Sequence, residues 1–233
     1  MLERIARHRR LSAACLWFLV CLVGHLASSP PTSMPRSGSV VRLMRAPLPS
    51  PLSWVAQHYW FAVGGNSSAL ERWEVWQDRD WGGESWGYVH RDLMAWDQSV
   101  GGGEAELVKE WRGSSAAEFV ICIERNAPEY EHAETYRAWP GPNSNTFVDS
   151  MLRNCGVAWT LDGSAIGKDY RGLLGASLTA GGTGIQVETP LLGILLGAGE
   201  GVQVHVLALT FGVDVWPPAI LTPFGDGRFG FYE

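Results

Sequence analysis

The sequence predicts an α+β domain in which an antiparallel sheet packs against a few helices. Three short runs of strand-like composition follow one another between Trp54 and His90. Segments whose apolar residues have helical spacing come after them. The chain has 233 residues, so the part behind its N-terminal segment has the size of one domain. Hydrophobic residues make up 46% of the chain, which is enough to fill a core.

The predicted strands are short and separated by turn signals. The run Trp54–Val63 is apolar and aromatic, and Arg72–Gln77 alternates polar and apolar side chains. A third strand is predicted over Trp86–His90. Because these strands are close in sequence, they predict an antiparallel meander. Two further strands are predicted at Ile185–Val187 and Gly201–Trp216, between glycine-rich loops.

Three helices are predicted, at Glu104–Trp111, Ser114–Arg125 and Ser144–Cys155. The second helix begins with a capping-box pattern, in which a serine caps the helix and Glu118 is its partner. Gly156 is placed to end the third helix. The apolar positions of the third helix predict the side chains that it buries against the sheet, which are Phe147, Val148, Met151 and Leu152.

The N-terminal segment has the parts of an export signal. Four arginines precede the apolar run Leu11–Val23, and small residues follow it. This pattern predicts that residues 1–27 are a signal peptide or an uncleaved membrane anchor. Residues 28–53 are rich in Pro and Ser and are predicted to be a linker. Residues 54–233 are predicted to form the single α+β domain.

The position of the arginines predicts an N-terminus inside the cell and a domain outside it. The expected location is therefore the inner membrane or the periplasm, with the N-terminal segment in contact with the membrane. Translation from Met34 or Met44 would instead give a cytoplasmic protein.

Composition limits the classes of partner. The net charge of −6 argues against nucleic-acid binding. Twelve tryptophans suit a core, an interface or a sugar-stacking surface. Cys122 and Cys155 are the two cysteines behind the leader. They could pair in an oxidising compartment, although two buried free thiols are the favoured interpretation.

The stretch Tyr136–Phe147 holds the strongest chemical candidates. A Pro-Gly-Pro turn leads to a helix that starts near Ser144, with Asn143 immediately before it. A helix N-terminus offers unpaired N–H groups and a positive dipole end, which favour a nucleophile and an oxyanion. His58 lies in a predicted central strand, and His90 ends another. The alternative is a purely structural role, in which Asn143 and Ser144 only cap the helix and His58 is a core residue.

Other groupings are weaker. His58, His90 and His132 could gather around a metal, but their spacing matches no zinc pattern, so no metal or cofactor is predicted. Arg72 and Glu74 could bind a polar ligand, and the alternative is an ion pair on a solvated face of the sheet.

Several motifs occur in an order that resembles a known bacterial family, catalogued as domain of unknown function 3750. They are the RWEVW, WPGPNSNTF, AIGKDY and GGTGIQV runs, and the resemblance extends from about Val40 to Phe231. The family implies a bacterial protein and no particular reaction. The order strand histidine, strand histidine, helix-opening nucleophile is also similar to circularly permuted papain-like hydrolases. Those enzymes usually carry Cys where this chain has Ser144, and Ser needs a stronger base.

Two functions follow from these observations. The first is a non-catalytic envelope module that binds a glycan or another envelope partner, because the tryptophan excess is not matched by a complete catalytic set. The second is a papain-like hydrolase or acyltransferase. In it, Ser144 is the nucleophile, His58 is the base and His90 orients the base.

Overall fold

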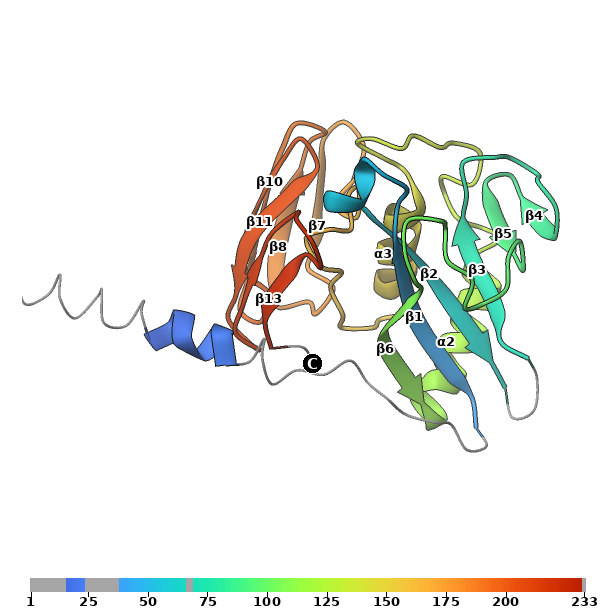
Figure 1. Ribbon diagram of the computed structural model, residues 1–233, viewed down its shortest axis with the longest axis horizontal. Helices are drawn as coiled ribbons and strands as arrows, with labels where there is room; N and C mark the ends of the chain where they lie inside the picture. The colour runs from blue at the N-terminus through green and yellow to red at the C-terminus, as the bar shows by residue number, and fades with distance from the viewer. Residues whose placement is uncertain (1–15, 24–37, 66–68, 232–233) are drawn as a thin grey trace, which may run out of the picture.

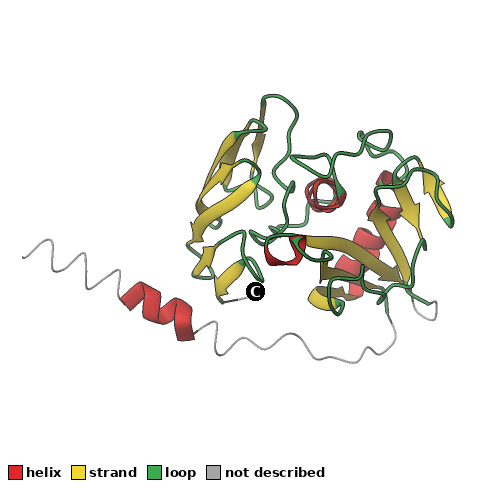
Figure 2. Cartoon of the chain, turned by 45° about the horizontal axis from the view of Figure 1, so that its top comes forward, coloured by secondary structure: helices red, strands yellow, loops and turns green. Residues whose placement is uncertain are grey.

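The computed structural model describes residues 16–23, 38–65 and 69–231, and it has two antiparallel sheets with helices beside them. The predicted α+β class is therefore confirmed. The first sheet lies on one side of the molecule and the second on the other, with α3 (Ser144–Asn154) between them (Figures 1 and 2). The predicted single antiparallel sheet is thus replaced by two.

The first sheet has six strands in the order β4-β5-β3-β2-β1-β6. Their bounds are Val40–Pro47 for β1, Gln57–Gly64 for β2, Glu71–Val75 for β3, Glu84–Trp86 for β4, Val89–Arg91 for β5 and Glu106–Arg112 for β6. A short 3-10 helix, Leu52–Trp54, precedes β2. The predicted antiparallel pairing is present through β2, β3 and β5, while β4 lies at the edge and pairs only with β5. The segment Trp86–His90 is two strands rather than one, because Gly87 turns the chain with a positive φ of 64°.

The sheet starts earlier in the chain than predicted. Residues 40–47 fall in the predicted linker, but they form β1, which lies between β2 and the edge strand β6 and pairs with both. The described domain therefore begins near Val40 rather than Trp54. The proline- and serine-rich composition around it predicts a linker, within which the sequence indicates only a short strand at Val40–Met44.

The predicted helix Glu104–Trp111 is wrong, since β6 occupies this segment. Its residues have good helix propensity, but β1 offers an edge to pair with, from Val40 opposite Arg112 to Arg45 opposite Glu106. Pairing across the sheet outweighs the local preference.

The other two predicted helices are confirmed. α2 spans Gly113–Asn126, although its N-cap is Arg112 and no side chain caps it, so the predicted capping box is wrong. In α3 the four predicted apolar side chains are all buried in one core with β2 and β3, and Gly156 follows the helix at a φ of 66°. Cys122 of α2 and Cys155 form a disulfide, which corrects the favoured interpretation of two free thiols.

The second sheet has seven strands in the order β13-β12-β11-β10-β9-β8-β7. Their bounds are Gly175–Leu178 for β7, Gly184–Glu188 for β8, Leu192–Gly197 for β9, Gly201–Val206 for β10, Leu209–Asp214 for β11, Ala219–Leu221 for β12 and Arg228–Gly230 for β13. The predicted strand at residues 201–216 is a hairpin. Its turn at Leu207 and Ala208 has two positive φ angles, a conformation common in tight hairpins.

Most of the predicted leader, residues 1–27, lies outside the described residues, as do residues 28–37 of the predicted linker. Residues 16–23 are helical. Among the described residues, no helix has the length and apolar character that a membrane crossing requires.

Candidate functional site

A pocket of about 640 Å³ opens where β2 and β3 diverge and the start of α3 enters. Registered pairs between β2 and β3 run only from Phe61 to Val63, so the backbone of β2 before Phe61 has a free edge. The side chain of Asn145 in α3 hydrogen-bonds to the backbone of this edge. It accepts a hydrogen bond from Tyr59 N (3.1 Å) and donates one to Gln57 O (2.9 Å). These two residues flank His58, so α3 is fixed to the strand at this histidine.

The start of α3 is held by an extensive capping arrangement. The Asn143 side chain accepts from the N–H groups of Asn145 and Thr146, and Thr146 Oγ1 accepts from Asn143 N, which completes a capping box. The Asn143 amide also donates to Ala138 O and Ile166 O, at 3.0 Å each. The side chain of Asn143 is therefore fully used in positioning the turn and the helix.

The AIGKDY run supports the start of α3 through two backbone carbonyl groups. Ile166 O accepts from the Asn143 amide, and Gly167 O accepts from Thr146 Oγ1 at 2.7 Å. Gly167 has a φ of 86°, and a Cβ there would lie 2.3 Å from the Asn143 amide nitrogen. Only glycine allows this loop to approach the helix start so closely. The WPGPNSNTF and AIGKDY motifs are thus two halves of one support for the first turn of α3.

Ser144 is the first residue of α3, and it lines the pocket together with His58 and Trp76. The structure thus brings the predicted nucleophile and base to one cavity. Within the described part of the chain, the Ser144 hydroxyl makes no hydrogen bond, and none joins it to His58. Such contacts are often long without a substrate and tighten when one binds.

The His58 ring is held by a buried carboxylate. His58 Nε2 lies 2.8 Å from Glu74 Oε2 on β3, and Trp76 packs edge-on against the ring with centroids 5.4 Å apart. Glu74 in turn pairs with Arg72, whose Nη2 donates to the same oxygen at 2.8 Å. Glu74 and Arg72 are fully buried. The expectation of an ion pair on a solvated face is therefore wrong.

The charge of Glu74 is secured by its neighbours. Burial by itself would raise the pKa of this carboxyl, but the His58 hydrogen bond and the His58 and Arg72 charges outweigh it, so the pKa is lowered. Arg72 donates to Ala95 O and Gln98 O, and its guanidinium lies 4.0 Å from the centroid of the Trp60 ring. An ionised Glu74 accepts from His58 Nε2–H, so in the neutral form of the ring the lone pair lies on Nδ1.

His90 does not take the predicted orienting role. It stands beside Glu74 in the register of β3 and β5, but it is buried and does not line the pocket. Its ring nitrogens contact Ser85 Oγ (2.8 Å) and Asp78 O (2.9 Å). Glu74 holds the position next to the base that the sequence assigned to His90. The alternation of Arg72–Gln77, which puts Arg72, Glu74 and Trp76 on one face, is the signal that could have identified it.

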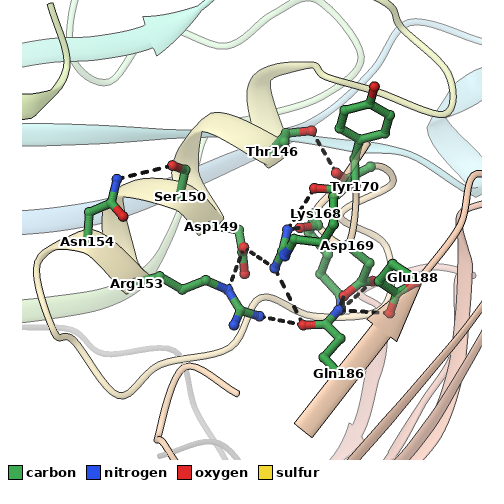
Figure 3. A network of polar contacts seen from close by, with 12 residues as sticks. Thr146, Asp149, Ser150, Arg153, Asn154, Lys168, Asp169, Tyr170, Gln186 and Glu188 are labelled. Atoms are coloured by element: carbon green, nitrogen blue, oxygen red, sulfur yellow. Dashed lines mark hydrogen bonds and ion pairs between the residues drawn. The ribbon is translucent and has the colours of Figure 1, made fainter. Parts of the chain in front are cut away.

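The three histidines considered for a metal do not form a cluster, since His58, His90 and His132 have separate partners. In the described residues, Asp169, Glu188 and His205 do come close enough to share an ion. This group already contains a cation, because Lys168 Nζ lies 2.7 Å from Asp169 Oδ2. It belongs to the polar network between α3 and β8 in Figure 3, where Arg171 and Arg153 both bind Asp149. We interpret it as structural pairing rather than a metal centre.

A second, smaller cleft of about 300 Å³ lies against the second sheet. Its polar lining includes Asp162, Asp214 and Arg228, and Arg228 Nη1 lies 2.5 Å from Asp214 Oδ2. Burial raises the pKa of Asp162 and of Asp214 more than the nearby arginine charges lower it. Trp216 stands at this cleft with 76% of its surface exposed.

A family model described as protein of unknown function (DUF3750) matches residues 38–170. The chain belongs to this family. The match contains β1 to α3, the AIGKDY loop, and all of Ser144, His58 and Glu74. It ends before β7, so the second sheet and the GGTGIQV run lie beyond the matched residues. No curated protein and no solved structure matches the chain.

Proposed function

We propose that this family member is a hydrolase or acyltransferase of papain-like design, held at or exported across a bacterial inner membrane. Ser144 is the nucleophile, His58 is the base, and Glu74 orients the base. The observation that carries the proposal is the buried Arg72–Glu74 pair, which binds Nε2 and so holds the His58 ring at the pocket that Ser144 lines. A structural histidine needs a hydrogen-bond partner, but it does not need a fully buried ion pair behind that partner.

In the proposed reaction, Ser144 Oγ attacks the carbonyl carbon of an ester or amide, and its proton passes to His58 Nδ1. The leaving group departs with that proton, and an acyl group remains on Ser144. Water or a second acceptor then gives its proton to His58 and attacks the acyl carbon, the bond to Ser144 Oγ breaks, and His58 returns the proton to Oγ. Glu74 stabilises the imidazolium in both steps, and the N–H of Ser144 donates to the developing oxyanion, since the Asn143 side chain already accepts from those of Asn145 and Thr146.

The apolar lining of the pocket favours an apolar group on the substrate. Leu48, Pro51, Val75, Tyr136 and Trp139 line the cavity together with Ser144. We infer an acyl group of apolar character rather than a charged one.

Serine-directed labelling tests this function. Purified full-length protein is treated with a fluorophosphonate, and the modified peptide is located by mass spectrometry. We expect labelling on Ser144 that is lost in Ser144→Ala and His58→Ala. Ser150→Ala, in the same helix and away from the pocket, is the matched control and should label normally. Labelling that survives Ser144→Ala, or that never occurs on Ser144, contradicts the proposal.

The second candidate function is glycan binding at the smaller cleft, and exposed Trp216 beside buried carboxylates favours it. Sugars bind by stacking on an aromatic face while acidic and basic groups take their hydroxyls. Titration with an N-acetylglucosamine tetramer should quench tryptophan fluorescence in the parent chain and not in Trp216→Ala. Equal quenching in both would refute this role. Trp54→Ala, which removes another exposed tryptophan, is the control.

The Cys122–Cys155 disulfide supports the envelope location, because disulfides form and persist in oxidising compartments. Fractionation of cells expressing the full chain should therefore place it in the inner membrane or the periplasm. A reduced, cytoplasmic protein would contradict this part of the proposal.

A further inference from the structure

The second sheet has the reverse of the usual arrangement, with its polar side chains inside and its apolar side chains outside. Gln186, Glu188, Gln203 and His205 are buried between this sheet and the rest of the domain. The alternate positions on the same strands point outward and are apolar. In a sheet with one solvated face, the opposite pattern is expected.

The outward side chains form continuous rows across the strands. The register pairs neighbours from β7 to β12 in a first row, which consists of Leu178, Ile185, Leu196, Val202, Val213 and Ile220. A second row runs beside it from β7 to β11 through Ala176, Val187, Ile194, Val204 and Phe211. We call these two rows the apolar face.

The apolar face is too large to be incidental. Nine of its eleven side chains are 39% to 65% exposed, and all eleven are uncharged. Single exposed apolar residues are common, but a contiguous patch above roughly 300–600 Å² marks a contact surface or an aggregation hazard. The exposed positions also hold valine, isoleucine and leucine, which offer no hydrogen bond to a protein partner.

The N-terminal helical segment continues this surface. The first row ends beyond Ile220 at Phe229 of β13, whose ring stacks on Phe18 with centroids 5.9 Å apart. Residues 16–23 lie at the foot of the second sheet in Figure 1 and expose Leu16, Leu19 and Val23. Four arginines precede this segment in the sequence. An apolar segment behind a basic cluster is typical of a membrane-binding region.

We infer that the apolar face of the second sheet and the exposed side of the N-terminal helical segment, residues 16–23, rest on the same lipid bilayer. One bilayer surface covers the rows of the sheet and the exposed side of residues 16–23 together. Trp216, which follows β11 and is mostly exposed, is suited to the boundary between headgroups and water. The inference does not depend on Ser144 or His58, because it concerns the sheet beyond the family match.

Vesicle binding by the full-length chain tests the inference. Ile194 and Val204 face each other in the register of β9 and β10, so Ile194→Gln with Val204→Gln removes the middle of the apolar face. Binding is measured by flotation with phosphatidylcholine–phosphatidylglycerol vesicles over a range of lipid concentrations. We expect the double variant to lower the partition coefficient at least tenfold. Ile121→Gln, an exposed apolar position on α2, should change it less than twofold.

Circular dichroism and the melting temperature establish that the double variant is folded. The oligomeric state of both proteins is measured by light scattering without vesicles. A partition coefficient equal to that of the parent chain overturns the inference. If the double variant also converts a dimer to a monomer, the apolar face is an interface between two copies of this chain. If neither the partition coefficient nor the oligomeric state changes, the apolar face is not used, and the N-terminal segment alone accounts for membrane binding.

Discussion

At the scale of single residues, the proposed chemistry depends on one buried carboxylate. Glu74 Oε2 lies within hydrogen-bond distance of both His58 Nε2 and Arg72 Nη2, and the pKa of Glu74 is lowered by these two neighbours against the effect of burial. Its negative charge fixes which ring nitrogen of His58 carries the proton. The free lone pair on Nδ1 is what allows the imidazole to act as a base.

Replacing that charge tests its role. Glu74→Gln keeps the shape of the side chain but removes the charge, so we expect fluorophosphonate labelling of Ser144 to slow by ~100-fold. His90→Gln should leave the labelling rate unchanged, because His90 does not line the pocket. The melting temperature of each variant is measured as well, because Glu74→Gln removes the charged partner of buried Arg72 and could destabilise the fold. Glu74→Asp, which retains the charge, should recover part of the rate, and equal rates in all variants would exclude Glu74 from the mechanism.

The sequence indicates Ser144 and His58 as candidates, whereas for Glu74 it gives only the alternation that puts Arg72, Glu74 and Trp76 on one face of a strand. A proline turn followed by Asn-Ser predicts a helix start, and a histidine within an aromatic run predicts an imidazole held in a strand. Arg72 and Glu74 alternate with apolar residues in the same way on a solvated face and on a covered one. Only the loop that supplies Ala95 O and Gln98 O to Arg72 decides which face is covered.

At the scale of elements, α3 positions the pocket by burying one face against β2 and β3. Phe147 is fully buried and packs edge-on against Tyr130 with ring centroids 5.3 Å apart. Phe147→Ala should therefore lower the free energy of unfolding by about 3–5 kcal/mol, through lost burial and the cavity that remains. Chemical denaturation measures this change. Ile121→Ala, at an exposed position of α2, is the control, and a similar small loss in both would show that α3 does not anchor the core.

The helices α2 and α3 could be predicted because their own residues carry the periodic signal. β6 could not, because Glu106–Arg112 has helical propensity and becomes a strand only through the open edge of β1. The second sheet was missed as a separate layer for a related reason. Its exposed valines at 202, 204 and 206 alternate as an inward-facing strand would, so the sequence does not tell which face is buried.

At the scale of the whole molecule, a charged network joins the second sheet to α3 and the AIGKDY loop. Asp169 receives hydrogen bonds from Lys168, Gln186 of β8 and Thr210 of β11. Burial would raise the pKa of Asp169, but the His205, Lys168 and Arg171 charges outweigh it and hold the pKa well below its usual range. A carboxyl with a depressed pKa stabilises the fold above its unfolded pKa, near 4, and loses this contribution as the pH falls below that value.

The network therefore predicts a pH-dependent difference between the parent chain and Asp169→Asn. The melting temperature of the parent should exceed that of the variant most at neutral pH, and the gap should narrow as the pH falls from about 4 toward 3. Asp162 and Asp214, whose raised pKa values act in the opposite direction, are present in both proteins and cancel in the difference. A gap that is constant between pH 7 and pH 3 would show that Asp169 contributes no charge to the network.

The mouth of the pocket and the second sheet also meet. Trp139 lines the pocket, and its Nε1–H donates to Leu207 O in the turn between β10 and β11 at 2.8 Å. The proposed catalytic cavity thus adjoins one end of the sheet whose outer surface carries the apolar face.

The most direct test of the central claim needs no substrate. Ser144→Cys puts a thiol at the start of α3, and its alkylation by iodoacetamide is followed against pH by mass spectrometry of the α3 peptide. An imidazole and a helix N-terminus within reach should lower the pKa of this thiol well below the ordinary value of about 8.5. When His58→Ala is added to Ser144→Cys, the pKa of the thiol should rise much of the way back to its ordinary value. A thiol that titrates at its ordinary pKa with or without His58 would show that the imidazole does not act on this position.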